Sequence, residues 1–145
     1  MKNGYGIIDR NPHPEDLAHV YSVKKNSVVP AKITISNNLV DNCGITSISS
    51  CGILVYYGYQ LEVCNNTVQR TGGSGIAVGW GFANNTIKKE TPASSGSILI
   101  RGNRVVSPCM RVPNAGGICA LGAFLDDGLT IDRNFVDMNG AISAQ

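Results

Sequence analysis

The 10 acidic residues, 2 histidines and 5 cysteines of this 145-residue chain are the side chains to consider first for catalysis. Two neighbouring carboxylates, Asp126 and Asp127, stand directly before a glycine. Paired carboxylates can serve as the acid and base of a hydrolytic reaction. Asp-Asp-Gly is also ordinary turn chemistry, so a polar turn is the alternative interpretation. If the chain is an enzyme, these two aspartates are its first candidate catalytic residues.

The cysteines and histidines form no metal-binding or nucleophilic motif. None of the 5 cysteines falls in a Cys-x-x-Cys spacing, and both histidines, His13 and His19, lie away from every cysteine in the sequence. A zinc site needs a cluster of such ligands, and a thiolate nucleophile needs a base. The glycine-rich residues 71–75 lack the lysine of a phosphate-binding loop. We therefore expect free thiols and neither a metal nor a cofactor.

The composition excludes several classes of partner. The net charge is +2, only 15% of the residues are charged, and the basic residues are scattered, which argues against nucleic-acid binding. No apolar run approaches the ~18–20 residues that span a bilayer, so we expect no membrane insertion. No signal-peptide pattern follows the first residues, which makes a cytoplasmic location the default expectation.

Aromatic side chains follow two of the apolar stretches. Trp80 has a glycine on each side, which leaves its indole free to stack on a sugar ring. Tyr56, Tyr57 and Tyr59 stand in the equivalent place after the preceding apolar stretch and could extend the same aromatic surface. The alternative is that these rings pack against the wall of the fold.

Two sequence patterns recur along the chain. Four segments, residues 33–40, 61–68, 98–105 and 129–136, run from alternating apolar residues through an asparagine to another apolar residue. Their asparagines are Asn38, Asn66, Asn103 and Asn134. A glycine followed by alternating apolar residues occurs after three of these segments, at Gly52, Gly75 and Gly117. The 27 isoleucines and valines favour strands, so the chain is predicted to be all-β.

The spacing of the asparagines predicts a β-solenoid. They are 28, 37 and 31 residues apart, and one coil needs roughly 20–25 residues with the excess in loops. Asparagine tolerates the left-handed backbone of a corner, and stacked amides can form a hydrogen-bonded ladder. Residues 84–87 repeat the pattern weakly and are assigned to a loop between residues 79 and 97. A β-sandwich is disfavoured because, after the first predicted strand, the sequence offers only Asn139–Gly140 as an Asn-Gly hairpin turn.

The first 30 residues lack the repeat. Residues 14–21 are compatible with one or two helical turns, so we divide the chain into an N-terminal cap or irregular segment, 1–30, and the repeats, 31–145. The last residues, 139–145, are too few to cover the other end of a solenoid. Self-association through that end is therefore expected.

Two segments resemble a known superfamily. Residues 74–82, SGIAVGWGF, resemble the SGISVGWGW segment of large bacterial β-helix glycoside hydrolases, and residues 114–122, NAGGICALG, resemble their DGGAIYTLG segment. The resemblance covers residues 31–140. It implies the pectate-lyase-like fold, here a short right-handed parallel β-helix of about four coils. The carboxylate of the family's Asp-Gly-Gly has no equivalent, because Asn114 or Ala115 stands in its place.

Three functions follow from these observations. The leading hypothesis is a carbohydrate-directed module that binds oligosaccharide or polysaccharide with weak or no catalysis. Its candidate binding residues are Trp80, Tyr56, Tyr57, Tyr59, Asn114, Asp126 and Asp127. The alternative is a structural protein that forms a homo-oligomer through its open ends. The third is a small glycoside hydrolase.

Overall fold

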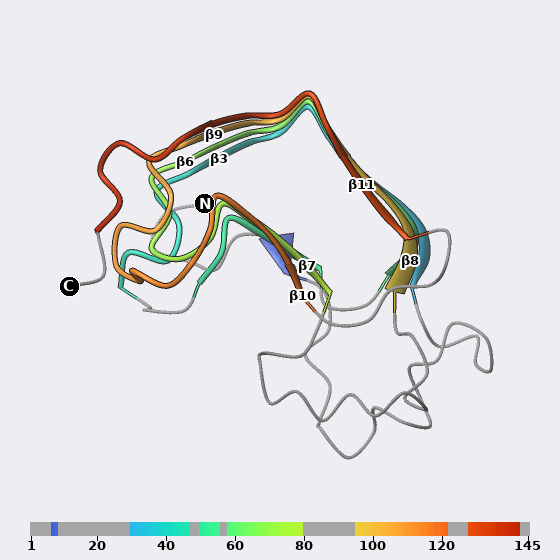
Figure 1. Cartoon of the computed structure of the whole chain (residues 1–145), viewed down its shortest axis with the longest axis horizontal. Helices are drawn as coiled ribbons and strands as arrows, with labels where there is room; N and C mark the ends of the chain where they lie inside the picture. The colour runs from blue at the N-terminus through green and yellow to red at the C-terminus, as the bar shows by residue number, and fades with distance from the viewer. Residues whose placement is uncertain are drawn as a thin grey trace, which may run out of the picture.

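The computed structural model describes residues 7–8, 30–46, 50–55, 58–79, 95–121 and 128–142. Its strands pass in turn through three parallel sheets, A, B and C (Figure 1). Sheet A contains β1 (Ile7–Ile8), β4 (Ile53–Val55), β7 (Ile76–Gly79) and β10 (Ile118–Leu121). Sheet B contains β2 (Ala31–Ser36), β5 (Gly58–Cys64), β8 (Ser95–Arg101) and β11 (Leu129–Asp132). Sheet C contains β3 (Leu39–Asp41), β6 (Thr67–Gln69), β9 (Arg104–Val106) and β12 (Phe135–Asp137).

This order is that of a parallel β-helix, and it confirms the predicted all-β fold. Successive strands of one sheet are separated by one strand of each other sheet, so the chain winds around a common axis. We call β2–β3–β4 the first rung, β5–β6–β7 the second, β8–β9–β10 the third and β11–β12 the last. No helix in the described part of the chain is long and apolar enough to cross a membrane.

Apolar side chains form columns inside the β-helix. In sheet B, Ile35 pairs with Val63, which pairs with Ile100, which pairs with Ile131. Val63 and Ile100 are fully buried. Sheet C adds a column of four valines, at positions 40, 68, 105 and 136. Because burying one such side chain contributes roughly 1.5–3 kcal/mol, these columns supply most of the driving force for coiling.

The predicted asparagine ladder is present at the corner between sheets B and C. The side-chain Nδ2 groups of Asn38, Asn66 and Asn103 donate to the Oδ1 of the next asparagine at 2.9, 3.0 and 2.9 Å. The same Oδ1 atoms also accept from the backbone N–H groups of Asn38, Asn66 and Asn103. Since Asn66 and Asn103 are 1% exposed, the ladder satisfies polar groups that have no access to water.

The prediction that these asparagines adopt the left-handed backbone conformation was wrong. Positive φ angles occur instead at the residue before each of them: Asn37 (57°), Asn65 (55°), Gly102 (64°) and Arg133 (49°). These residues turn the corner, and each ladder asparagine then points its amide along the stack. The turning role and the hydrogen-bonding role therefore belong to different residues.

The recurring glycines make room for the valine column. A Cβ atom added to Gly52, Gly75 or Gly117 would lie 2.3–2.4 Å from the Cγ1 atom of Val68, Val105 or Val136, respectively. Such a distance is far below van der Waals contact. The glycine-strand pattern therefore records where sheets A and C approach each other too closely for a side chain.

Part of the predicted N-terminal segment joins the β-helix. Ile7 and Ile8 pair in parallel with Ile53 and Leu54, so β1 forms the outer strand of sheet A. The helical turns expected at residues 14–21 lie outside the described residues, as do residues 84–87.

Candidate functional site

A polar groove crosses the outer face of sheet B. It encloses about 520 Å³. Its lining comes from three successive strands, β5, β8 and β11: Gln60, Glu62, Ser97, Ile98, Leu99, Arg101 and Thr130. The groove therefore runs along the axis of the β-helix, across the strands.

Strand alternation explains why polar groups line this groove. Leu61 and Val63 are fully buried, whereas Glu62 between them is exposed. Glu62 pairs with Leu99, which pairs with Thr130, so one outward column contributes a side chain from each rung. Alternation in the sequence could have indicated each outward position. It could not indicate which outward residues share a groove, because that depends on the register between rungs.

Backbone geometry sets the start of the groove. Gln60 and Ser97, which begin it, have φ angles of 55° and 51°. Lys32 at 57° and Gly128 at 56° continue the same column on the first and last rungs. These four residues share no side-chain type, so the sequence carries no signal for this column of positive φ angles except the glycine.

The charges in and beside the groove differ in how they are paired. Arg101 contacts Asp132 at 2.9 Å, and Asp132 also contacts Arg133 at 3.0 Å. Glu62 makes no ion pair within the described residues. The groove thus presents one carboxylate that is available to a ligand, and a guanidinium that is anchored by its own partner.

This arrangement suits binding better than hydrolysis. Carboxylate, amide, hydroxyl and guanidinium groups together offer both donors and acceptors to a ligand with many hydroxyls. Glycoside hydrolysis usually needs two carboxyl groups roughly 5–9.5 Å apart. Glu62 and Asp132 lie two strands apart, at ~4.8 Å per strand, and are also two residues apart along the strand direction. Asp132 is in addition held by two arginines. These two carboxylates are therefore poorly placed to act together in hydrolysis.

Two of the predicted binding residues lie in the described structure. Tyr59 is half-buried on β5, directly before Gln60, at the start of the groove. Asn114 is exposed in the connection from sheet C to sheet A, between β9 and β10. Tyr59 instead follows the connection from sheet A to sheet B. The structure does not bring these two residues together.

The remaining predicted residues, Tyr56, Tyr57, Trp80, Asp126 and Asp127, lie outside the described residues. Their place in the chain is informative even so. All five belong to connections that lead from sheet A into sheet B, 56–57, 80–94 and 122–127. These connections enter sheet B at the strand ends where the groove begins.

The five cysteines are free thiols. Burial raises the pKa of Cys51 to about 11, with a smaller contribution from the neighbouring Cys119. Burial also raises the pKa values of Cys43 and Cys109. Ser74 contacts both Cys51 and Cys119, with its Oγ 3.3 Å from the sulfur of Cys119. Thiols with raised pKa values remain protonated at neutral pH, so these three are structural rather than nucleophilic.

Comparison with known proteins agrees with the architecture. A family model described as "Right handed beta helix region" matches residues 30–94. No curated protein and no solved structure matches the chain significantly. The matched residues contain β2 to β7, and β8 to β12 continue the same three sheets beyond them. Together the family match and the stacked parallel sheets show a parallel β-helix, of which residues 30–94 match the right-handed form.

Proposed function

We propose that this chain is a carbohydrate-directed module that binds an extended oligosaccharide along the groove of sheet B without hydrolysing it. The observation that carries the proposal is the predominantly polar lining contributed by β5, β8 and β11. Each of these strands contributes a polar side chain to the groove, so a linear ligand that crosses the strands meets polar partners from successive rungs.

The position of the aromatic residues supports the same ligand class. Tyr59 adjoins the groove, and Trp80 belongs to a connection that leads into sheet B. Aromatic faces stack on the apolar faces of sugar rings, while polar side chains bind their hydroxyl groups. A polar groove whose lining residue Gln60 directly follows Tyr59 offers both interactions.

A thermal-shift screen against oligosaccharides from plant, algal and bacterial polysaccharides tests the proposal. A ligand that binds only the native state stabilises it by about 2.7 kcal/mol at a hundredfold excess over its dissociation constant. We expect one class of sugar to raise the melting temperature, and we expect its length to remain unchanged on incubation.

Substitution then locates the binding surface. Gln60→Ala and Glu62→Ala are expected to weaken binding of the identified sugar at least tenfold by removing groove side chains. Gln69→Ala is the matched control, because Gln69 is half-buried on the same rung but belongs to sheet C. Equal affinity in all three variants, or release of shorter sugars, would contradict the proposal.

A further inference from the structure

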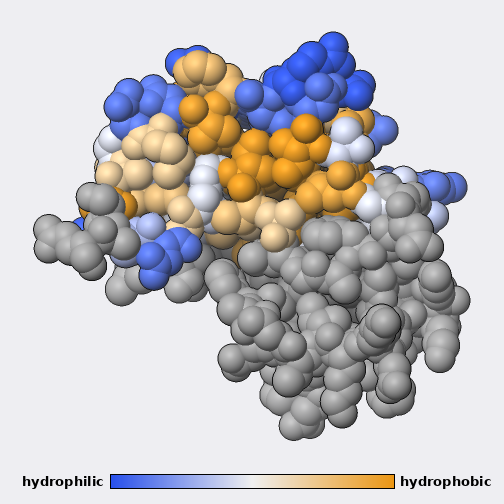
Figure 2. Space-filling view, viewed as in Figure 1, coloured by the Kyte–Doolittle hydropathy of each residue, from blue (hydrophilic) through white to orange (hydrophobic). Residues whose placement is uncertain are grey.

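The last rung presents apolar core residues to solvent. Ile131 is 49% exposed and Val136 is 41% exposed. The residues that occupy the same two columns on the first rung, Ile35 and Val40, are only 9% and 3% exposed. Figure 2, which views the molecule with the last rung nearest, shows apolar side chains gathered in the middle of this face. One end of the β-helix is therefore open and the other is covered.

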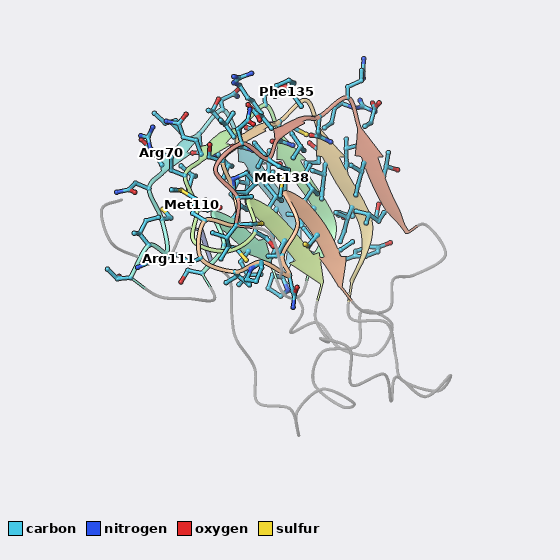
Figure 3. The ribbon with its side chains drawn as sticks, turned by 60° about the vertical axis from the view of Figure 1, so that its left-hand side comes forward. Arg70, Met110, Arg111, Phe135 and Met138 are labelled. Atoms are coloured by element: carbon cyan, nitrogen blue, oxygen red, sulfur yellow. The ribbon has the colours of Figure 1, made fainter. Side chains whose placement is uncertain are left out.

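The open face is hollow rather than flat. A depression of about 630 Å³ is lined by residues of the last two rungs, among them Ile118, Ile131, Val136 and Met138. Met138, in the loop after β12, is 42% exposed and extends the apolar surface (Figure 3). Phe135 contributes to the outer side instead, where its ring covers Arg104 of the third rung, 4.6 Å from the guanidinium carbon to the ring centroid.

Unpaired backbone and side-chain groups accompany this apolar surface. In the described structure β11 pairs only with β8, and β12 only with β9, so one edge of each strand has no partner. The ladder also ends here, because Asn134 accepts two hydrogen bonds from Asn103 while its own backbone N–H meets no acceptor among the described residues. Such an edge readily pairs with another strand.

We propose that this face binds the identical face of a second copy of the chain, so that two β-helices meet end to end about a two-fold axis. A two-fold interface must be complementary to itself. The rim of the face carries both signs of charge, with Arg133 beside Asp132, and Asp137 at the end of β12. A two-fold axis perpendicular to β11 also sets the free edges of β11 and its copy antiparallel, an arrangement in which they can form a regular hydrogen-bond ladder.

The covered first rung argues against head-to-tail stacking. A head-to-tail contact would need an apolar face at both ends and would continue into a filament. Because Ile35 and Val40 are already buried, the two ends do not match. The expected assembly is a closed dimer. This interface lies at the end of the β-helix, and the groove on the outer face of sheet B reaches that end at Thr130 of β11.

Sedimentation velocity over a range from micromolar to several hundred micromolar tests the proposal. We expect a concentration-dependent dimer that does not grow further. Ile131→Lys and Met138→Lys are each expected to raise the dimer dissociation constant at least tenfold, because each places a charge in a surface that becomes buried from water in the dimer. Leu39→Lys is the matched control, since Leu39 is 67% exposed on the outside of the first rung. Its dimer is expected to match that of the parent chain.

Three results would overturn the dimer. The first is a monomer at every concentration, and the second is a series of oligomers that lengthens with concentration, which would indicate head-to-tail contact. The third is a dimer that survives both lysine substitutions in the last rung. Met138 lies beyond the final strand, so Met138→Lys leaves the core intact, and circular dichroism of each variant verifies the fold.

Discussion

Asn103 uses the full hydrogen-bonding capacity of its side-chain amide. Its Oδ1 accepts from the backbone and the side chain of Asn66, and its Nδ2 donates to Asn134 and to the carbonyl of Val63. All four bonds connect different rungs. A single amide thus joins the second, third and last rungs at one corner.

Removing this amide is expected to cost far more than removing one at the end of the ladder. Asn103→Ala leaves the buried polar groups of Asn66 without acceptors, and each such group costs about 1–3 kcal/mol, so we expect a total loss of about 3–5 kcal/mol in urea unfolding. Asn38→Ala is the control, because Asn38 is exposed and water can replace its bonds. Its expected loss is about 1 kcal/mol. Similar losses for both variants would show that the ladder does not act as a connected network.

The raised pKa of Cys51 predicts a loss of stability at high pH. The unfolded thiol ionises near its ordinary pKa of 9.0, whereas the folded thiol ionises only near a pKa of about 11. The contribution is complete below pH 9 and is lost between pH 9 and about 11, because only the unfolded state releases its proton there. The loss is on the order of 2–3 kcal/mol. Urea unfolding of the parent and of Cys51→Ala at pH 8 and pH 10.5 isolates this contribution, and an identical pH dependence in both would contradict it.

Residue identity predicted the asparagine ladder but not the column of positive φ angles in sheet B. The ladder could be predicted because its hydrogen bonds require the same side chain, asparagine, on every rung. The column of positive φ angles could not be predicted, because this backbone conformation is adopted by unlike side chains. Its members are Lys32, Gln60, Ser97 and Gly128.

At the scale of the strands, the glycines before sheet A fix how closely two sheets approach. An added Cβ at Gly75 would lie 2.4 Å from Cγ1 of Val105 and 2.8 Å from the carbonyl oxygen of Gly117. The valine belongs to a fully buried column, and the carbonyl is part of the backbone. Neither neighbour can move without shifting a whole strand.

Gly75→Ala is therefore expected to destabilise the chain by about 3 kcal/mol, the upper end of the cost of overpacking a core. Gly58→Ala provides the comparison, because its nearest neighbour, Cγ1 of Val55, would be 3.4 Å away, an ordinary contact distance. Its expected effect is below about 1 kcal/mol. Denaturation midpoints of the two variants measure the difference, and equal midpoints would show that sheets A and C can separate at little cost.

The groove on sheet B shows what strand patterns alone do not predict. Glu62 and Thr130 are 68 positions apart in the sequence and share a column because both pair with Leu99 of the rung between them. The sequence patterns predicted the strands and their inward faces. They did not predict which outward side chains become neighbours.

For the molecule as a whole, the repeat predicted the architecture but not the arrangement of the candidate site. The sequence predicted Asn114 and the aromatic residues as one binding set, yet Asn114 lies between sheets C and A, whereas Tyr59 is the second residue of β5 in sheet B. Which side of a β-helix a loop occupies depends on the sheet it follows. To know which sheet a loop follows, one must distinguish the strands of all three sheets. The asparagine pattern joined the strands of sheets B and C in one segment, and only the glycine pattern marked a sheet of its own, sheet A.

The connections between sheets differ in how much their lengths vary, so the β-helix tolerates insertions on one side. The corner between sheets B and C is always two residues long: 37–38, 65–66, 102–103 and 133–134. The passage from sheet A to sheet B ranges from residues 56–57 to residues 80–94. Insertions between sheets B and C would displace an amide of the ladder, whereas insertions between sheets A and B leave every rung in register. New binding specificities can therefore evolve, or be engineered, by lengthening loops beside the groove while the opposite corner preserves the fold.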